Sequence, residues 1–138
     1  MRSYSVYCYN QAKGNTVASG IYLLSRGRNT GRPAFSPNRN SIVLKCAPQD
    51  VEYFYWLCFG LWKAGIFRQI LTGSVIELIR LGTLRKVIDK VNHNSELLTD
   101  KIPTLQAAIQ LEQNYVQQIA KLKDLQIALF YQYMKESA

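Results

Sequence analysis

The sequence predicts an α+β fold, in which a small mixed or antiparallel sheet with a buried helix is followed by a long C-terminal helix. Three observations support this prediction: short β-branched and aromatic segments in the first third, one strongly apolar segment in the middle, and a final stretch without glycine or proline. The chain has 138 residues, 48% of them hydrophobic, which is enough for a real core. We expect a sheet-and-helix domain over residues 1–98 and the long helix over residues 99–138.

Three strands are expected in the first third of the chain. Residues 4–9 (YSVYCY), 20–25 (GIYLLS) and 41–46 (SIVLKC) are rich in strand-forming residues and are bounded by turn formers. The stretch SRGRNTGRPAFSPNRN, residues 25–40, joins the last two of them. Its two glycines and two prolines exclude regular structure, so we expect an ordered loop of about fifteen residues. Loops of this length are usually functional or mobile.

Residues 48–65 predict a buried helix. Asp50 stands where a helix cap is expected. From Tyr53 to Trp62, every residue except Gly60 has a large apolar or a thiol side chain. A helix that is apolar on every side lies in a protein core or in a membrane, and this run is about half the ~20 residues that a membrane span needs. Burial inside the protein is therefore expected.

The next segments give weaker patterns. Residues 66–71 extend the helix or form a short second one, and residues 75–79 (VIELI) alternate as a strand would. Residues 82–91 fit a helical turn that leads into another strand, and their periodicity does not decide between helix and strand.

A long helix is expected near the C-terminus, with Thr99, Asp100 and Pro103 near its start. Residues 104–134 contain no glycine or proline and would form a helix of ~46 Å. Alternating steps of three and four residues from Leu105 to Tyr133 give nine positions, which would form one coiled-coil-like seam along the helix. Two of these positions, Glu112 and Gln126, are polar. The seven apolar positions are Leu105, Ala108, Tyr115, Ile119, Leu122, Leu129 and Tyr133. This pattern predicts a homodimer or a partner helix through residues 104–134, the alternative being that the helix packs along its own domain.

The basic charge is concentrated in the first third. The net charge is +8, and residues 1–49 hold seven basic side chains and no acidic one. A field of one sign attracts polyanions, so a nucleic acid or another polyanion is the expected partner, while the alternative is a basic surface that serves only solubility. The candidate nucleic-acid contacts, to phosphates or base edges, are Arg26, Arg28, Arg32 and Arg39, with Lys13 and Lys45 as outer electrostatic contacts. The first-third tyrosines could stack on bases or simply pack within the sheet.

Residues 53–88 (YFYWLCFGLWKAGIFRQILTGSVIELIRLGTLRKVI) resemble the closing half of a target-recognition domain from type I restriction-modification specificity subunits. In that family an apolar helix is followed by a Thr-Gly-Ser-like turn, here Thr72-Gly73-Ser74, and then by apolar positions, here Ile79, Leu84 and Ile88. Residues 102–134 are similar in place, length and seam to the long spacer helix of these subunits. The sequence FYWLCFGLW…GSVIELIR, within residues 54–80, also resembles a bacterial family of unknown function.

The first resemblance implies a half-sized, non-enzymatic DNA-reading module whose long helix makes a dimer or docks a partner subunit. Two departures from that family are visible. Ala107-Ala108 replaces the Glu-Gln pair that usually follows the opening proline and leucine, and the N-terminal half is shorter than in a full recognition domain. The second resemblance implies no activity.

No catalytic chemistry is expected. His93 is the single histidine, which excludes a multi-histidine metal site and a histidine-dependent triad, and no nucleotide-binding glycine motif occurs. Cys8, Cys46 and Cys58 show no ligand spacing, and buried structural thiols are expected for the last two. No signal peptide is visible, so we expect a cytoplasmic protein with reduced thiols and with no cofactor, metal, membrane or small-molecule partner.

The rival prediction is a protein-interaction module, in which the long helix binds a partner chain and no nucleic acid is bound. A peripheral membrane protein is a third alternative, and it ranks last because the chain lacks a basic amphipathic helix.

Overall fold

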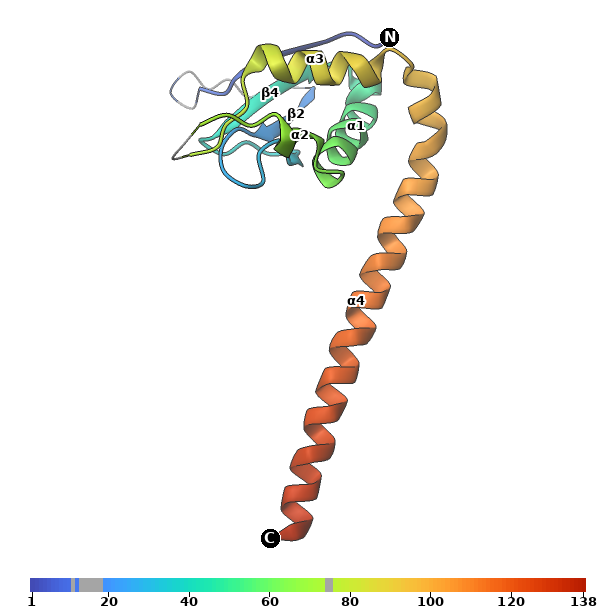
Figure 1. Cartoon of the computed structure of the whole chain (residues 1–138). Coiled ribbons are helices and arrows are strands. Elements are labelled where there is room, and N and C mark those ends of the chain that lie inside the picture. Colours follow the sequence, from blue (N-terminus) through green and yellow to red (C-terminus); the bar gives the residue numbers. More distant parts are fainter. Residues whose placement is uncertain (11, 13–18, 74–75) are drawn as a thin grey trace. The chain divides into compact units, whose positions relative to one another are not determined.

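The computed structural model of the chain describes residues 1–10, 12, 19–73 and 76–138. It confirms the α+β class: an antiparallel sheet is combined with helices, and a long helix follows (Figure 1). The chain divides into two units, Met1–Asp100 and Lys101–Ala138. The sheet, its helices and all the candidate DNA contacts belong to the first unit, and most of the long helix makes up the second.

The described strands form one four-stranded sheet in the order β1-β4-β2-β3. The strands are β1 (Tyr4–Cys8), β2 (Gly20–Leu24), β3 (Pro33–Ala34) and β4 (Ser41–Cys46), and all pairs are antiparallel. The three strands predicted from composition are therefore confirmed. β3 was not predicted, because its proline argues against a strand. It lies at the sheet edge, where a missing backbone donor is tolerated.

The central strand β4 is the most deeply buried part of the sheet. Ile42, Val43 and Leu44 are at most 1% exposed, although successive side chains point to opposite faces. The face that carries Ile42 and Leu44 also carries Tyr4, whose ring lies 5.2 Å from that of Phe54 on the neighbouring helix. This face is therefore the one that the helices cover.

The helical layer consists of a 3-10 turn and three helices. The turn η2 (Pro48–Asp50) leads into α1 (Val51–Lys63), which is followed by α2 (Ile66–Gln69) and α3 (Leu81–Asn92). Helix α3 contacts β1, and α1 contacts β2 and β3. Asp50 occupies the N-cap position of α1 but makes no capping hydrogen bond; it forms an ion pair with Arg2 at 3.0 Å instead.

Two segments after α2 differ from the expectations. Residues 82–91 are wholly helical, because Leu84, Ile88 and Asn92 recur every four residues and are all buried. Residues 76–79 do not form the strand predicted over residues 75–79, so the prediction is wrong for them. Val75 lies outside the described residues. Leu78 forms only isolated bridges, to Arg26 and to Thr72, so this segment pairs with the arginine-rich loop rather than joining the sheet.

A polar network fixes the start of the chain to three helices. Asn92, fully buried, donates from Nδ2 to the carbonyl of Arg2 at 2.7 Å, and its Oδ1 accepts hydrogen bonds from the Arg2 N–H and the Tyr53 hydroxyl. The Arg2 guanidinium lies 4.2 Å from the centre of the Tyr53 ring and donates to Asp50 and Thr99. The buried polar groups of Asn92 are thus satisfied by the backbone of residue 2.

The three thiols are all described and all free, and they should differ sharply in reactivity. Cys46 and Cys58 are buried as expected, while Cys8 is exposed. Burial, with a smaller contribution from the Asp50 carboxylate, raises the pKa of the Cys46 thiol to about 11, and burial also raises the pKa of Cys58. The thiolate is the reactive form, so we expect Ellman's reagent to modify one thiol per native chain at neutral pH and three in denaturant. Rapid modification of more than one native thiol would contradict the buried positions.

The long helix α4 spans Ser95–Ser137, 43 residues or about 65 Å. It begins four residues before the expected range 99–138, and Pro103, expected near its start, lies inside the helix. A proline there removes the bond to the carbonyl of Thr99, which normally ends or kinks a helix. The turns before it are held in the first unit by other contacts: Ser95 is buried, and the Thr99 hydroxyl donates to the Ser95 carbonyl at 2.8 Å and accepts from Arg2.

Candidate nucleic-acid interface

The arginine-rich loop, residues 25–40, is held by backbone hydrogen bonds along its length. Ser25 donates to the carbonyl of Asn40 at 2.8 Å, and Gly31 donates to that of Leu24 at 2.7 Å. Within the loop, the Thr30 hydroxyl bonds the carbonyl of Gly27, and the N–H of Gly27 bonds the carbonyl of Glu77. The loop therefore has a defined conformation, which presents its side chains at fixed positions.

One glycine of this loop packs against the core. Gly31 is buried with φ +92°, and a Cβ at this position would overlap the ring of Phe67 in α2. Phe67 is itself fully buried. This contact joins the loop to α2.

Five of the six candidate DNA contacts are described, and Lys13 lies outside the described residues. None of the five forms an ion pair with an acidic side chain in the described ranges. Their charges are therefore available to a solvent-borne anion. The exposed five are Arg26, Arg28, Arg32, Arg39 and Lys45.

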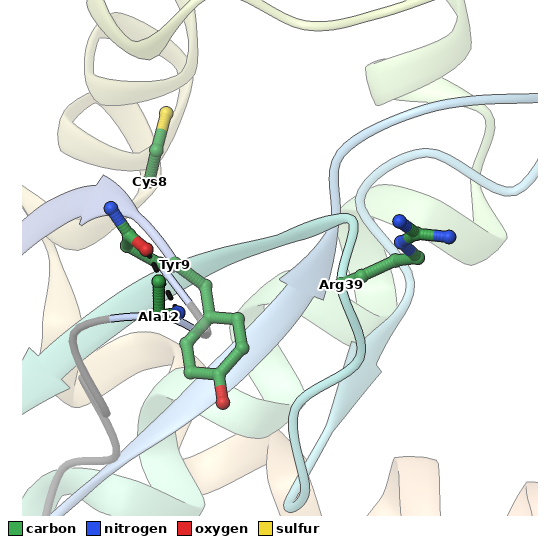
Figure 2. Close-up of a pocket in the computed structure, with 5 residues that line it drawn as sticks. Cys8, Tyr9, Ala12 and Arg39 are labelled. Carbon is green, nitrogen blue, oxygen red and sulfur yellow. Dashed lines mark hydrogen bonds between the residues drawn. The ribbon is translucent and has the colours of Figure 1, made fainter.

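The structure does not gather these residues into one surface. Arg39 lines a depression of about 620 Å³ with Cys8, Tyr9, Asn10 and Ala12, and Figure 2 shows its guanidinium extending away from the Tyr9 ring. Lys45 lies toward the end of β4 away from the loop, on the face opposite the helices. The charge count identified the basic third of the chain but not how its members are distributed.

Arg28 instead joins two cations that the sequence analysis did not select. Lys63 ends α1 and Arg68 lies in α2, and both line a cleft of about 310 Å³ with Arg28. No acidic side chain of the described residues lines this cleft, which we call the basic cleft. Its remaining lining residues are Asn29, Thr30, Trp62 and Gly65. The sequence does contain a local signal for this second group of cations. Residues 53–76 hold two basic residues, Lys63 and Arg68, and no acidic one.

A row of aromatic side chains lies on α1 beside the basic cleft. The helix was expected to be buried on every side, but only its inner face is, through Tyr53, Phe54, Leu57, Cys58 and Leu61. Tyr55, Trp56, Phe59 and Trp62 are partly exposed, and their rings contact one another in sequence with centroids 5.2–6.2 Å apart. Phe35 of the loop is 63% exposed and stacks on Tyr55 at 4.6 Å.

Arg32 connects this aromatic row with the loop. Its guanidinium lies 5.4 Å from the centre of the Trp62 ring, within the range of a cation–π interaction. Of the loop arginines, Arg32 thus contacts Trp62, and Arg28 lines the cleft to which Trp62 also belongs. The first-third tyrosines mainly pack: Tyr4 contacts Phe54, and Tyr22, which is buried, contacts Tyr9 edge to face.

The apolar seam predicted on the long helix is exposed. Between Leu111 and Met134, twelve large apolar side chains are more than half exposed, including Tyr115, Ile119 and Leu122. Leu105 is partly exposed and Ala108 is exposed. The segment 104–138 holds three basic and three acidic side chains, so it carries no net charge.

The described residues contain no cluster of three or more histidine, cysteine, aspartate or glutamate side chains that could hold a metal ion. His93 is exposed and lies directly after the end of α3. No helix in the described part of the chain has both the length and the apolar content that crossing a bilayer requires.

Comparison with known proteins places the chain in a family. Residues 6–132 match DUF6943, described as a family of unknown function, and the chain belongs to it. The matched range includes the sheet except for the first two residues of β1, the basic cleft and most of the long helix. No curated protein and no solved structure matches the chain.

Proposed function

We propose that this protein is a non-enzymatic, cytoplasmic module that binds double-stranded DNA through the arginine-rich loop and pairs through its long helix. The observation that carries the proposal is that the loop has a defined conformation and exposes Arg26, Arg28, Arg32 and Arg39 without ion-pair partners among the described acids. Arginine suits this role because its planar fork can bind a phosphate or a guanine edge in two places.

The loop has an adjacent positive surface that extends its reach. Arg32 lies over the Trp62 ring, and Arg28, Lys63 and Arg68 line the same cleft as Trp62. The acidic residue Glu77 takes part in the backbone hydrogen bonds of the loop, because its carbonyl accepts from the N–H of Gly27. The DNA-facing part of the loop is accordingly proposed to be its Arg28–Arg32 side, with Arg39 and Lys45 as outer electrostatic contacts.

The long helix supplies the second half of the proposal. We assign a second copy of the same helix as the partner of its exposed seam. Heptad-like spacing is self-complementary, and a segment without net charge pairs with its own copy without like-charge repulsion. The arrangement of a recognition domain followed by a pairing helix is the one that the resemblance to restriction-modification specificity subunits implies. In this proposal the chain is a half-sized version of such a subunit.

The first test is fluorescence anisotropy with a random duplex of about 30 base pairs, titrated from about 50 to about 300 mM salt. We expect affinity to fall steeply with salt, and we expect Arg28→Ala with Arg32→Ala to reduce the log–log slope by about 2, since each lost phosphate contact reduces it by about 1. The matched control is Lys86→Ala with Lys90→Ala, which removes two exposed cations from α3, the helix that contacts β1. Absence of binding at the lowest salt would contradict the proposed function.

The exposed seam of α4 also favours a second candidate function, a protein-interaction module that binds no nucleic acid. In that case the long helix is the functional surface and the basic loop is incidental. Self-association at micromolar concentration together with indifference to DNA would select this alternative.

A further inference from the structure

The basic cleft is a concavity of the first unit that is lined by three cations. It brings together Arg28 from the loop, Lys63 from the end of α1 and Arg68 from α2. Arg28 and Arg68 form no ion pair with an acidic side chain of the described residues, so their charges can act on an anion that enters the cleft. A concave site lined by one sign of charge concentrates the field toward such an anion.

The walls of the cleft are fixed before any ligand arrives. Thr30 is 2% exposed and its hydroxyl bonds the Gly27 carbonyl, so it holds the backbone on the loop side. Gly31 packs against the buried ring of Phe67, which holds the loop against α2. Such preorganisation lowers the entropy that binding would otherwise cost.

The chemistry of the lining selects the class of anion. A guanidinium group binds two oxygens of a phosphate at once, whereas an ammonium group acts as a compact point charge with three donors. The cleft offers two guanidinium groups, one ammonium group and the exposed side chain of Asn29. A tetrahedral phosphate, with several oxygens to share, satisfies more of these donors than a planar carboxylate does.

We propose that the cleft of Arg28, Lys63 and Arg68 beside Trp62 is a phosphate-binding site. The inference rests on the proposed function for the source of the phosphate, which is then the backbone of bound DNA. The same chemistry would accept a free phosphate compound, so inorganic pyrophosphate serves as the second probe.

The decisive variant is Lys63→Gln with Arg68→Gln, which removes the two cations outside the loop and leaves all its arginines in place. The control is Lys86→Gln with Lys90→Gln on α3, and circular dichroism and thermal melts verify that both variants fold. We expect the cleft variant to bind the random duplex at least about tenfold more weakly than the control variant, with a salt slope lower by about 2.

The second readout uses tryptophan emission. The chain has two tryptophans, so Trp56→Phe leaves Trp62 as the single reporter in the cleft wall. Titration with pyrophosphate should change Trp62 emission saturably, and the change should be lost when Lys63→Gln and Arg68→Gln are added.

The outcomes separate this inference from the proposed function. If the wild type binds DNA with a steep salt slope and the cleft variant matches its control, the cleft assignment is overturned while DNA binding stands. If the wild type binds no DNA but pyrophosphate changes Trp62 emission in a cleft-dependent way, the phosphate site stands with a free phosphate compound as its ligand, and DNA binding falls. If neither probe binds, both proposals are overturned.

Discussion

Replacing Ile119 and Leu122 with aspartate is expected to convert a self-associated protein into a monomer of 15.8 kDa. Both side chains are more than half exposed on α4 and stand next to each other in the predicted seam. A dimer would bury four new carboxylates, and an unpaired buried charge costs several kcal/mol, so self-association should weaken by more than ~100-fold. Sedimentation equilibrium over a range of micromolar concentrations measures the change directly.

The control for this prediction places the same charge on the opposite side of the helix. Gln117 is exposed and lies five positions after Glu112 of the seam, which in a heptad is the face away from the partner. Gln117→Asp should leave the association constant within about threefold of wild type, since an exposed charge is not desolvated. A wild-type protein that remains at 15.8 kDa at every concentration would rule out pairing with a second copy.

The second large effect is expected from Gly31→Ala. This residue has φ +92°, a conformation that side chains rarely adopt, and its added Cβ would overlap the buried ring of Phe67. The strain costs about 1–2 kcal/mol and forced overpacking about 1–3 kcal/mol more, so a loss of about 2–5 kcal/mol in the free energy of unfolding is expected. Urea denaturation followed by circular dichroism gives this quantity.

Gly27→Ala is the matched control for Gly31→Ala. Gly27 has φ +91°, almost the same backbone conformation, but nothing lies within 4 Å of a Cβ added there. The free energy of unfolding of this variant should therefore fall by only about 1–2 kcal/mol, the cost of the backbone strain alone. Equal losses for the two variants would show that the contact between the loop and Phe67 contributes nothing to stability.

Much of the sheet could be predicted from sequence, because strand-forming residues and turn formers alternate clearly there. Residues 41–46 form the central strand as predicted, and burial on both faces explains their continuous apolar run. The segment 82–91 was harder to assign because Asn92, a polar residue, occupies one position of the buried face of α3. The hydrogen bonds that make this burial possible come from residue 2, ninety positions away, and no local pattern contains them.

The aromatic run of α1 shows a different limit. Its composition predicts burial, but one layer of sheet covers only one side of a helix, and Tyr55, Trp56, Phe59 and Trp62 lie on the other. The start of α4 was misplaced because Pro103 is a strong local signal for a helix start, whereas Ser95 and Thr99 are fixed by tertiary contacts.

The candidate site was only partly predictable for a related reason. The loop arginines stood out as a charge cluster in the sequence, while Lys63 and Arg68 lie outside the basic first third of the chain. Only the turn between α1 and α2, together with the packing of Phe67 against the loop, brings these two cations beside Arg28.

The strand order has a consequence for how the protein is made. β1 and β2 both pair with β4, the last strand to be synthesised, and Asn92 completes the core only at the end of α3. The first unit therefore cannot complete its core until about two thirds of the given sequence has been synthesised. Its sheet is expected to form late, after both β4 and α3 have been made, rather than strand by strand along the chain.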